Sequence, residues 1–428
     1  MSQRWRSALA LVALSLGATA RAAAAGPDGT PPTESDDVFA EVEAGLSPNA
    51  AAGESERTAA AQAKPRARTS PTIPARAASA SGVMNPELSV IANFAAAAFS
   101  DEHHLESGAH DPERTGFNLQ ALELSVRSVV DPYLRFDAHL AFGEEGVELE
   151  EAFATTLGLP GGLQARMGQF LSRFGRINAT HPHAWNFVDQ PFALGRIFGG
   201  DGNRGLGAEV SWLAPLPWYV EAVASLMNPG SPNTARSFAS EDERAVRELG
   251  ALLYVGALKQ SFELADDWTL LFGTSGAFGP GAASGERAEV YGTDLFMKYR
   301  PITRASTTEL TWQTELFYRR RHLALQTLTD VNGYTEVFLR FARRWGTAAR
   351  YELGTPAYPT GPRVTDPLDP AWQATRFRVS ANVTHWPSEF SRFRLQGSAD
   401  MPGWRPRPVY AVFLAAEFVV GAHGAHTF

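Results

Sequence analysis

The residues of this sequence best suited to bind a metal ion lie in one segment. His181 and His183 stand two residues apart, and Asp189 follows six residues later. Imidazole nitrogens and carboxylate oxygens are ligands that zinc accepts. The spacing matches no strong zinc-binding motif, so the competing interpretation is that these residues belong to a structural loop. We therefore keep a metal site at His181, His183 and Asp189 as an alternative hypothesis.

Other groupings offer little support for catalysis. Ser388 and Ser391 follow His385 closely, but nothing in the sequence places a base beside a nucleophile. Glu150 and Glu151 are adjacent, and adjacent side chains of a strand point to opposite faces, which separates the two carboxylates. The chain has no cysteine, which excludes disulfides, thiolate metal ligands and cysteine nucleophiles. We predict that the protein is not an enzyme and needs no cofactor.

The N-terminal region has the composition of a targeting signal followed by a tether. Arg4 and Arg6 precede a short apolar run, and small residues follow it, so residues 1–25 are predicted to be a signal peptide. Residues 26–83 are rich in Ala, Pro, Ser and Thr, with Phe39 as the single aromatic residue. Such a segment buries too little apolar surface to offset the entropy of ordering. We predict a disordered arm there.

From Asn85 onward, apolar and polar residues alternate with a period of two. In the segment 307–319, Trp312 and Leu316 share one parity, whereas Gln313 and Glu315 share the other. Successive side chains of a strand point to opposite faces, so such a segment has one apolar and one polar face. Sixteen candidate strands begin near Leu88, Asn118, Tyr133, Val147, Leu163, Leu206, Trp218, Glu248, Trp268, Glu289, Thr307, Thr335, Ala348, Thr375, Ser391 and Val409.

Short connections between these segments alternate with long ones, which is typical of an outer-membrane barrel. In lipid every backbone polar group must pair internally, and a closed sheet achieves this without an edge. A soluble β-sandwich or β-propeller would also alternate, but would bury its apolar face in a core. We predict an all-β fold: a transmembrane, antiparallel, up-and-down β-barrel of about sixteen strands, in the range of about 14–18, over residues 84–428. Aromatic residues near segment ends would form the interfacial girdles: Tyr133, Trp212, Trp218, Trp268, Tyr299, Trp345, Trp372 and Trp404.

A barrel of this size encloses a water-filled lumen unless something blocks it. The stretch from Leu171 to Arg204 is the best candidate for a loop folded inward; the alternative is a loop packed on the rim. Acidic residues cluster early in the barrel and arginines cluster late, so the two signs would lie on different parts of the wall and create a transverse field. The predicted residues of the pore lining and constriction are Arg173, Arg176, Arg196, Glu148, Glu150, Arg319, Arg340, Arg376, Arg378, Arg392 and Arg394.

Three segments of the sequence resemble a family of Gram-negative outer-membrane β-barrels. They are the ending Gly421–Phe428, the segment Asn178–Pro191, and Val129–Tyr133 leading into an acidic strand. The family is porin-like, and its members are labelled porins or, loosely, TonB-dependent outer-membrane receptors. The resemblance covers about residues 84–428 and implies an outer-membrane barrel in which Phe428 is the signal read by the barrel assembly machinery. A TonB-dependent receptor needs a plug domain and about 22 strands, which this chain is too short to supply.

The sequence therefore predicts a porin-like channel for passive diffusion of small hydrophilic solutes, with a slight preference for anions because arginines dominate the polar parity. The alternative is an occluded uptake protein that binds a substrate or a metal ion such as zinc. The expected location is the Gram-negative outer membrane, reached through the periplasm. The expected partners are outer-membrane lipid, the assembly machinery, hydrophilic solutes and copies of the same chain in a homo-oligomer. The net charge of −8 argues against nucleic acid as a partner.

Overall fold

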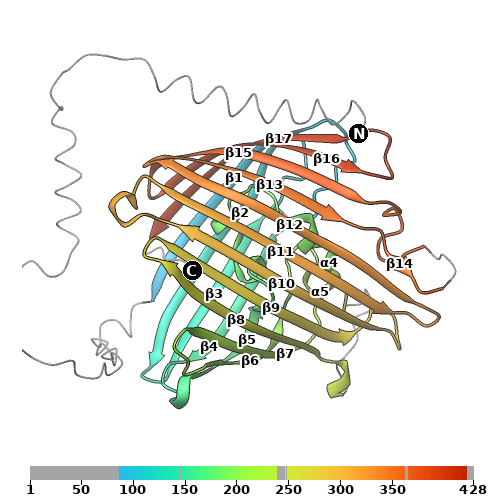
Figure 1. The fold of residues 1–428 in the computed structure, drawn as a ribbon, viewed down its shortest axis with the longest axis horizontal. Coiled ribbons are helices and arrows are strands. Elements are labelled where there is room, and N and C mark those ends of the chain that lie inside the picture. Colours follow the sequence, from blue (N-terminus) through green and yellow to red (C-terminus); the bar gives the residue numbers. More distant parts are fainter. Residues whose placement is uncertain (1–85, 145, 239–245, 247, 362–364, 422–428) are drawn as a thin grey trace, which may run out of the picture. The chain divides into compact units, whose positions relative to one another are not determined.

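The computed structural model describes residues 86–144, 146–238, 246, 248–361 and 365–421. These residues form one antiparallel sheet of sixteen long strands and one short edge strand (Figure 1). The long strands are β1 (Glu87–Phe99), β2 (Gly116–Asp131), β3 (Leu134–Gly143), β4 (Gly146–Thr156), β5 (Leu163–Leu171), β6 (Arg204–Leu213), β7 (Tyr219–Met227), β8 (Leu253–Ala265), β9 (Trp268–Pro280), β10 (Arg287–Tyr299), β11 (Glu309–His322), β12 (Thr327–Ala342), β13 (Trp345–Gly354), β15 (Arg376–Ser388), β16 (Ser391–Pro402) and β17 (Val409–Gly421). The short strand β14 (Tyr358–Pro359) pairs with the start of β12.

Each long strand pairs with its neighbours along the chain, and β1 closes the sheet by pairing with β17. Val90 near the start of β1 lies opposite Val420 near the end of β17, so β1 begins and β17 ends at the same end of the barrel. The predicted fold, a closed up-and-down barrel of sixteen strands, is confirmed. Within the described residues, no helix has the length and apolar character needed to cross a membrane.

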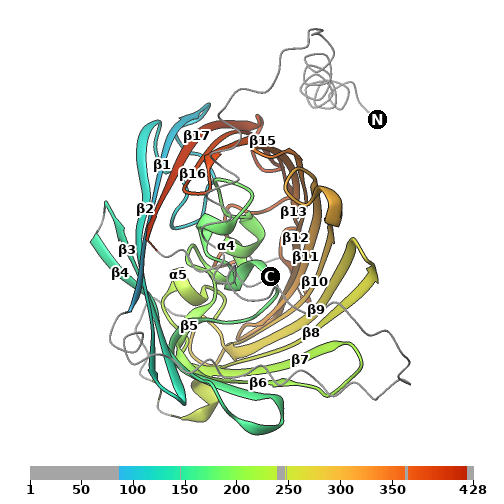
Figure 2. The same ribbon diagram turned by 90° about the vertical axis from the view of Figure 1, so that its left-hand side faces the viewer.

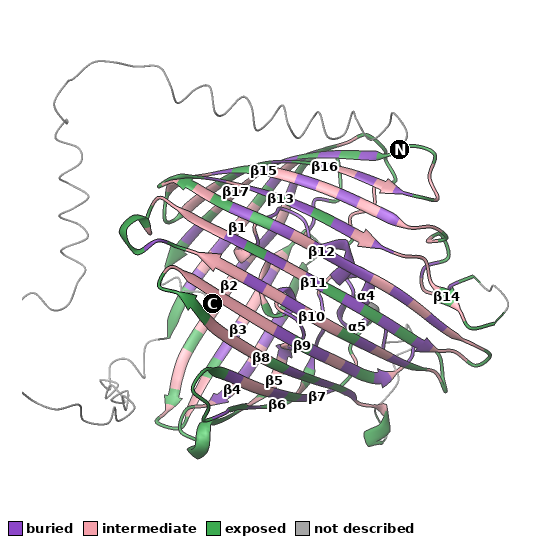
Figure 3. Cartoon of the chain, in the orientation of Figure 1, coloured by how far each residue is buried: buried purple, intermediate pink, exposed green. Residues whose placement is uncertain are grey.

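Side chains alternate between the two faces of the wall as the sequence pattern predicts. On β11, Gln313 and Glu315 point inward and are buried, whereas Trp312, Leu316 and Tyr318 point outward and are exposed. Buried residues alternate with intermediate or exposed ones along the strands that face the viewer in Figure 3. The outer face of the barrel is thus apolar, as lipid requires, and the polar parity lines the lumen.

Most of the aromatic residues predicted for the girdle lie at the barrel end where β1 begins and β17 ends. Tyr133, Trp212, Trp218 and Trp345 are exposed there, at the ends of strands. Trp372 is a correction: its ring packs against Phe192 inside the barrel, with ring centroids 5.7 Å apart. It belongs to the loop between β13 and β15, which turns inward, so it does not face lipid.

The connections at the end where β1 begins and β17 ends are short, and the longest loops lie at the other end. In outer-membrane barrels the short turns are periplasmic and the long loops extracellular. The long loops are residues 100–115, 172–203, 228–252 and 355–375. Strand β12 begins at Thr327, eight residues before the predicted start near Thr335, and β8 begins at Leu253, five residues after the predicted start near Glu248.

Several predictions made from the sequence lie outside the described residues. They are the signal peptide (1–25), the arm (26–83) and the terminal Phe428. The barrel itself begins with β1 at Glu87, close to the predicted boundary at residue 84.

Candidate functional site: a loop-filled lumen

Residues 172–203, between β5 and β6, fold into the barrel, and we call them the inward loop. Figure 2 looks into the barrel and shows the loop's helix α4 (Phe192–Phe198) surrounded by the wall strands. All seven residues of α4 are buried. Most of the buried apolar side chains of the loop pack against wall residues in one cluster, whose members include Phe174, Phe192, Leu194, Ile197, Phe198, Met227, Leu253, Val290 and Phe317. Each such side chain contributes about 1.5–3 kcal/mol by leaving water, so this packing holds the loop inside the lumen.

At one bend of the inward loop, a carboxylate of the wall accepts hydrogen bonds from the loop backbone. Glu315 on β11 accepts hydrogen bonds from the backbone N–H groups of Ile177 at 2.8 Å and Arg176 at 3.1 Å. Gly175 just before them has a φ of 58°, and a Cβ built there would collide with the Glu315 carboxylate. Only glycine adopts this backbone without strain, so this turn depends on Gly175.

Two networks of buried ion pairs join the inward loop to the basic half of the wall. In the first, Arg196 of α4 donates to Asp369 at 3.0 Å and to Asn332 at 2.9 Å, while Arg319 on β11 donates to Asp330 at 2.9 Å. Burial raises the pKa of the Asp369 carboxyl, but Arg319 and Arg196 outweigh it and hold that pKa below its usual range. Arg196 and Arg319 thus serve as anchors of the loop and not as free charges in a pore.

The second network surrounds Asp189, the predicted metal ligand. Its carboxylate lies 2.7 Å from Arg350 on β13 and 3.0 Å from Arg378 on β15. Burial opposes ionisation, yet these two guanidinium groups lower the pKa of Asp189. Arg378 also pairs with Glu352 at 2.7 Å and donates a hydrogen bond to Glu106 from the loop 100–115. The structure therefore separates Asp189 from His181 and His183, and the predicted set of three ligands is not assembled.

The two histidines instead meet carboxylates of the acidic wall. His183 Nδ1 lies 3.0 Å and His181 Nδ1 lies 3.7 Å from Glu123 Oε2 on β2. A 3-10 turn at Pro182–Ala184 places both rings on this side, with ring centroids 5.6 Å apart. Burial lowers the pKa of His181, but Glu123 and the neighbouring glutamates raise it well above the usual range.

A β-bulge turns two consecutive carboxylates of β4 toward the same histidines. The register between β3 and β4 shifts by one residue at His139, which faces Glu151, while Leu140 faces Leu149 and Glu150 is left over. A bulge re-aims side chains in this way. As a result Glu150 and Glu151 are both buried, and His181 Nε2 lies 2.9 Å from Glu151. The expectation that adjacent glutamates diverge is wrong at this position.

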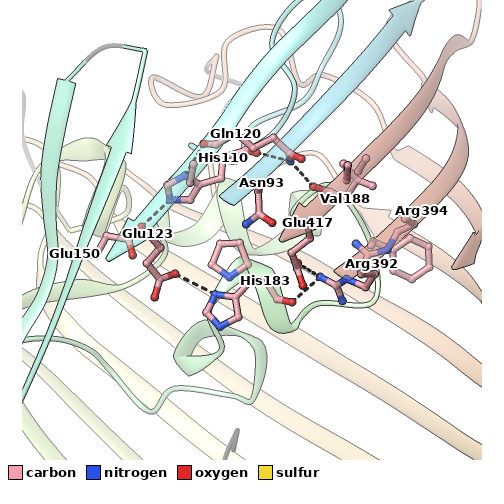
Figure 4. Close-up of a pocket in the computed structure, with 15 residues that line it drawn as sticks. Asn93, His110, Gln120, Glu123, Glu150, His183, Val188, Arg392, Arg394 and Glu417 are labelled. Atoms are coloured by element: carbon pink, nitrogen blue, oxygen red, sulfur yellow. Dashed lines mark hydrogen bonds and ion pairs between the residues drawn. The ribbon is translucent and has the colours of Figure 1, made fainter. Parts of the chain in front are cut away.

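A polar pocket lies between the inward loop and the wall formed by β1, β2, β4, β16 and β17 (Figure 4). Glu123, Glu150 and His110 line one side of it, and Arg392 and Arg394 on β16 line the other. Arg392 pairs with Glu417 on β17. Arg394 donates to the backbone carbonyl of Trp185 at 2.9 Å, and in the described part of the chain no carboxylate lies within ion-pair distance of it. Acidic and basic walls thus face each other here.

The remaining predicted lining residues lie in separate places. Arg173 pairs with Glu209 and Glu221, both at 2.7 Å, and Arg376 pairs with Asp400. Arg176 stacks on Phe296, with its guanidinium carbon 3.8 Å from the ring centroid, and its Nε donates to Gln313 at 3.1 Å.

The last two of the predicted lining residues lie toward opposite ends of the barrel. Glu148, near the start of β4, pairs with Arg204. Arg340 stacks over Trp386 near the periplasmic turns, 4.5 Å from the ring centroid. The lining therefore consists mainly of paired charges, which reduces the net positive field expected from the arginines.

Two residues of the histidine and glutamate cluster were missed from the sequence. They are Glu123 and His139, which lie 3.1 Å apart on neighbouring strands. Both fall on the polar parity of their segments, so the alternation alone could have placed them in the lumen. Their approach to His181 could not be predicted, because it depends on the fold of a loop distant in sequence.

The groups considered for catalysis do not form a catalytic arrangement. The hydroxyl groups of Ser388 and Ser391 lie 3.0 Å from each other, and His385 Nδ1 lies 3.1 Å from the backbone carbonyl of Arg344. The first contact belongs to the periplasmic turn between β15 and β16, and the second joins β15 to the turn between β12 and β13.

Comparison with known proteins relates the chain to outer-membrane barrels. No family model matches the sequence. An uncharacterized protein of Aquifex aeolicus (strain VF5) is 34% identical over 339 residues, which cover 74% of this chain and 71% of that protein. Among solved structures, the outer membrane channel DcaP of Acinetobacter baumannii is similar with a TM-score of 0.53 and 10% identity, covering 78% of this chain and 97% of that one. The anion-selective porin from Comamonas acidovorans is similar with a TM-score of 0.52 and 10% identity, covering 78% of this chain and 99% of that one. At such low identity these two structures establish the fold. The chain belongs to the same family as the Aquifex aeolicus relative, and its fold is that of the porin-like outer-membrane β-barrels.

Proposed function

We propose that the protein is a narrow, loop-constricted channel that lets small hydrophilic solutes diffuse passively across the outer membrane. The observation that carries this proposal is the barrel's polar lumen with a loop folded to mid-barrel and a polar pocket left beside that loop. The solved structures with the same fold include one described as a channel and one described as an anion-selective porin. We propose no bond chemistry; the partners we propose are outer-membrane lipid, the assembly machinery, hydrophilic solutes and copies of the chain itself.

The pocket is the proposed path because it combines both signs of charge. Glu123 and Glu150 face Arg392 and Arg394 across it. A transverse field of this kind orients dipolar solutes and disfavours apolar ones. Selectivity for anions rests mainly on Arg394, since the other arginine of this wall pairs with Glu417.

Planar-bilayer recording of the purified barrel tests the proposal. We expect small, discrete current steps, and reversal potentials under a salt gradient that show a slight anion preference. Arg394→Gln is expected to shift the reversal potential toward cations, whereas Arg320→Gln, on the outer face, should leave it unchanged. A complete lack of current from correctly folded protein would refute the channel, and a strong cation preference would refute the role of Arg394.

The second candidate is an occluded uptake protein. The buried aromatic cluster of the inward loop favours it, because Phe174, Phe192 and Phe198 are no more than 1% exposed and leave no water around them. In that case the purified barrel would carry no current and would still bind a solute or a metal ion. Single-channel conductance distinguishes the two functions.

A further inference from the structure

Seven ionisable side chains meet where the inward loop touches the acidic wall. His181 and His183 come from the inward loop, His110 from the loop 100–115, and the others from wall strands: Glu123 on β2, His139 on β3, and Glu150 and Glu151 on β4. None of the seven is exposed. The cluster contains four imidazoles beside three carboxylates, so it offers nitrogen as well as oxygen ligands for a metal ion and is not merely an acidic patch.

The spacing of three donor atoms fits one metal ion. His181 Nδ1 and His183 Nδ1 lie 3.7 Å and 3.0 Å from Glu123 Oε2. Each of the three residues offers one donor atom that lies within 4.8 Å of the other two. A tetrahedral ion with bonds of about 2.0–2.1 Å needs donors about 3.3 Å apart, and both distances from Glu123 lie within about 0.4 Å of that spacing.

The surroundings of these donors also match a metal site. The second ring nitrogen of His181 lies 2.9 Å from Glu151, which leaves Nδ1 to face Glu123 and Glu150. Histidines that bind metals commonly donate their other N–H to a carboxylate in this way, which orients the ring and raises its basicity. Glu123 is itself held by a second histidine, because His139 Nδ1 lies 3.1 Å from its other carboxylate oxygen, Oε1.

One buried oxygen points independently to a missing ligand. Glu150 Oε2 accepts no hydrogen bond, although the side chain is only 8% exposed, and its contact with His181 Nδ1 is an ion pair at 3.6 Å, beyond hydrogen-bond distance. A buried carboxylate oxygen that accepts no hydrogen bond is costly. The bulge at this residue brings the oxygen to the histidines, and a cation there would satisfy it.

We propose that Glu123, His181 and His183 bind a divalent transition-metal ion of the zinc class, with Glu150 as the fourth donor, and that the ion ties the inward loop to strand β2. Imidazole and carboxylate ligands select such ions over magnesium or calcium, which prefer oxygen ligands alone. The binding claim is independent of the channel. Its consequence for current, a loop held more firmly in the lumen, rests on the proposed function.

Calorimetry and Co²⁺ absorption of the full-length barrel in detergent, first stripped with EDTA, test the binding. We expect one Zn²⁺ per chain, and visible Co²⁺ bands of a site with nitrogen ligands. His181→Asn and His183→Asn should each weaken Zn²⁺ binding at least tenfold, and Glu123→Gln should act in the same way. His385→Asn is the matched control, because His385 lies at a periplasmic turn and should leave binding unchanged.

Each outcome decides the proposal once folding has been checked by the heat-dependent mobility of the barrel in gels. Zn²⁺ binding that is lost in the three variants and kept in the control supports the site. An absence of binding, or equal binding by His181→Asn and the control, overturns it and leaves a set of ion pairs that needs no metal. If a variant fails to fold, the Co²⁺ spectrum of the wild type still decides, since a spectrum of hexa-aquo Co²⁺ contradicts imidazole ligands.

Bilayer recording separates this proposal from the proposed channel. If both hold, micromolar Zn²⁺ should lower the wild-type conductance, EDTA should restore it, and His181→Asn should not respond. Binding without any current would leave the metal site standing and refute the channel. If Zn²⁺ binds but the conductance does not change, the proposal that the ion ties the inward loop to strand β2 is refuted.

Discussion

Arg350 on the barrel wall holds Asp189 of the inward loop through two contacts at once. Its two terminal nitrogens donate to the backbone carbonyl of Asp189 at 3.0 Å and to the carboxylate at 2.7 Å. Both side chains are almost fully buried. The pair fixes the loop's backbone as well as its side chain, so the wall determines where the loop lies in the lumen.

Replacing Arg350 should loosen the inward loop. In Arg350→Met, Asp189 loses one of its two guanidinium partners, and removing one member of a buried pair costs about 3–5 kcal/mol. We expect larger and noisier current steps in planar bilayers and a lower unfolding temperature. Arg320→Met is the control, because Arg320 on β11 is 46% exposed and makes a long ion pair of 3.8 Å on the outer face. Equal behaviour of the two variants would contradict the anchoring role of Arg350.

Gly175→Ala should displace the turn of the inward loop whose backbone N–H groups donate to Glu315. The added methyl group meets the Glu315 carboxylate, and the positive φ strains any residue other than glycine. We expect this variant to fold into a barrel with a lower unfolding temperature and with increased proteolysis of the inward loop. Gly397→Ala on β16, where a methyl group would meet nothing within 4 Å, should match the wild type. Protection of the loop in both variants would argue against this contact.

Stability should depend on pH through Glu106 in the loop 100–115. Burial, opposed by Arg378 and reinforced by Asp189 and Asp111, raises the pKa of Glu106 to about 8. The folded chain therefore keeps a proton that the unfolded chain loses above its ordinary pKa of about 4.5, so this group makes stability fall as pH rises from about 4.5 to about 8. In Glu106→Gln that fall should vanish. Thermal unfolding of the wild type and of Glu106→Gln from pH 5 to 9 measures this fall. If the difference in unfolding temperature between the two proteins does not grow with pH, the raised pKa of Glu106 is contradicted.

A charge placed on the outer face should impair insertion into lipid. Leu316 lies in the middle of β11 and points outward, so Leu316→Arg should cost about 2–4 kcal/mol at the bilayer midplane. Folding yield and urea titration in lipid vesicles measure this cost. Leu325→Arg is the control, because Leu325 is 99% exposed in the loop between β11 and β12. A similar cost for both would show that the outer face does not contact lipid.

The wall of the barrel could be predicted from the sequence because lipid and lumen impose opposite polarity on alternate residues. The predicted start of one strand near Thr335 was too late. Asp330 and Asn332 lie within β12 and bind Arg319 and Arg196. The strand therefore starts eight residues earlier than predicted, and its polar beginning serves the inward loop.

The interior of the lumen was beyond such reasoning. The sequence indicates that Leu171 to Arg204 is long and rich in aromatic and charged residues, but the partner of each charge depends on the loop's path across the barrel. Asp189 illustrates this: it is near the histidines in sequence but lies in the arginine network. The arginines of the late strands were correctly assigned to the polar parity, whereas their neutralisation by loop and wall carboxylates could not be read from spacing.

Because of the one-residue shift at Glu150, the residues of β4 that face inward have even numbers before the shift and odd numbers after it. Val147 and Leu149 face outward before the shift, whereas Glu151 and Phe153 face inward after it. Deleting Glu150 would restore regular pairing and keep both halves in place, because Leu149 would still face outward and Glu151 and Phe153 would still face inward. The extra residue is therefore not needed for the alternation of the wall; its effect is to place a second carboxylate beside the histidines of the inward loop.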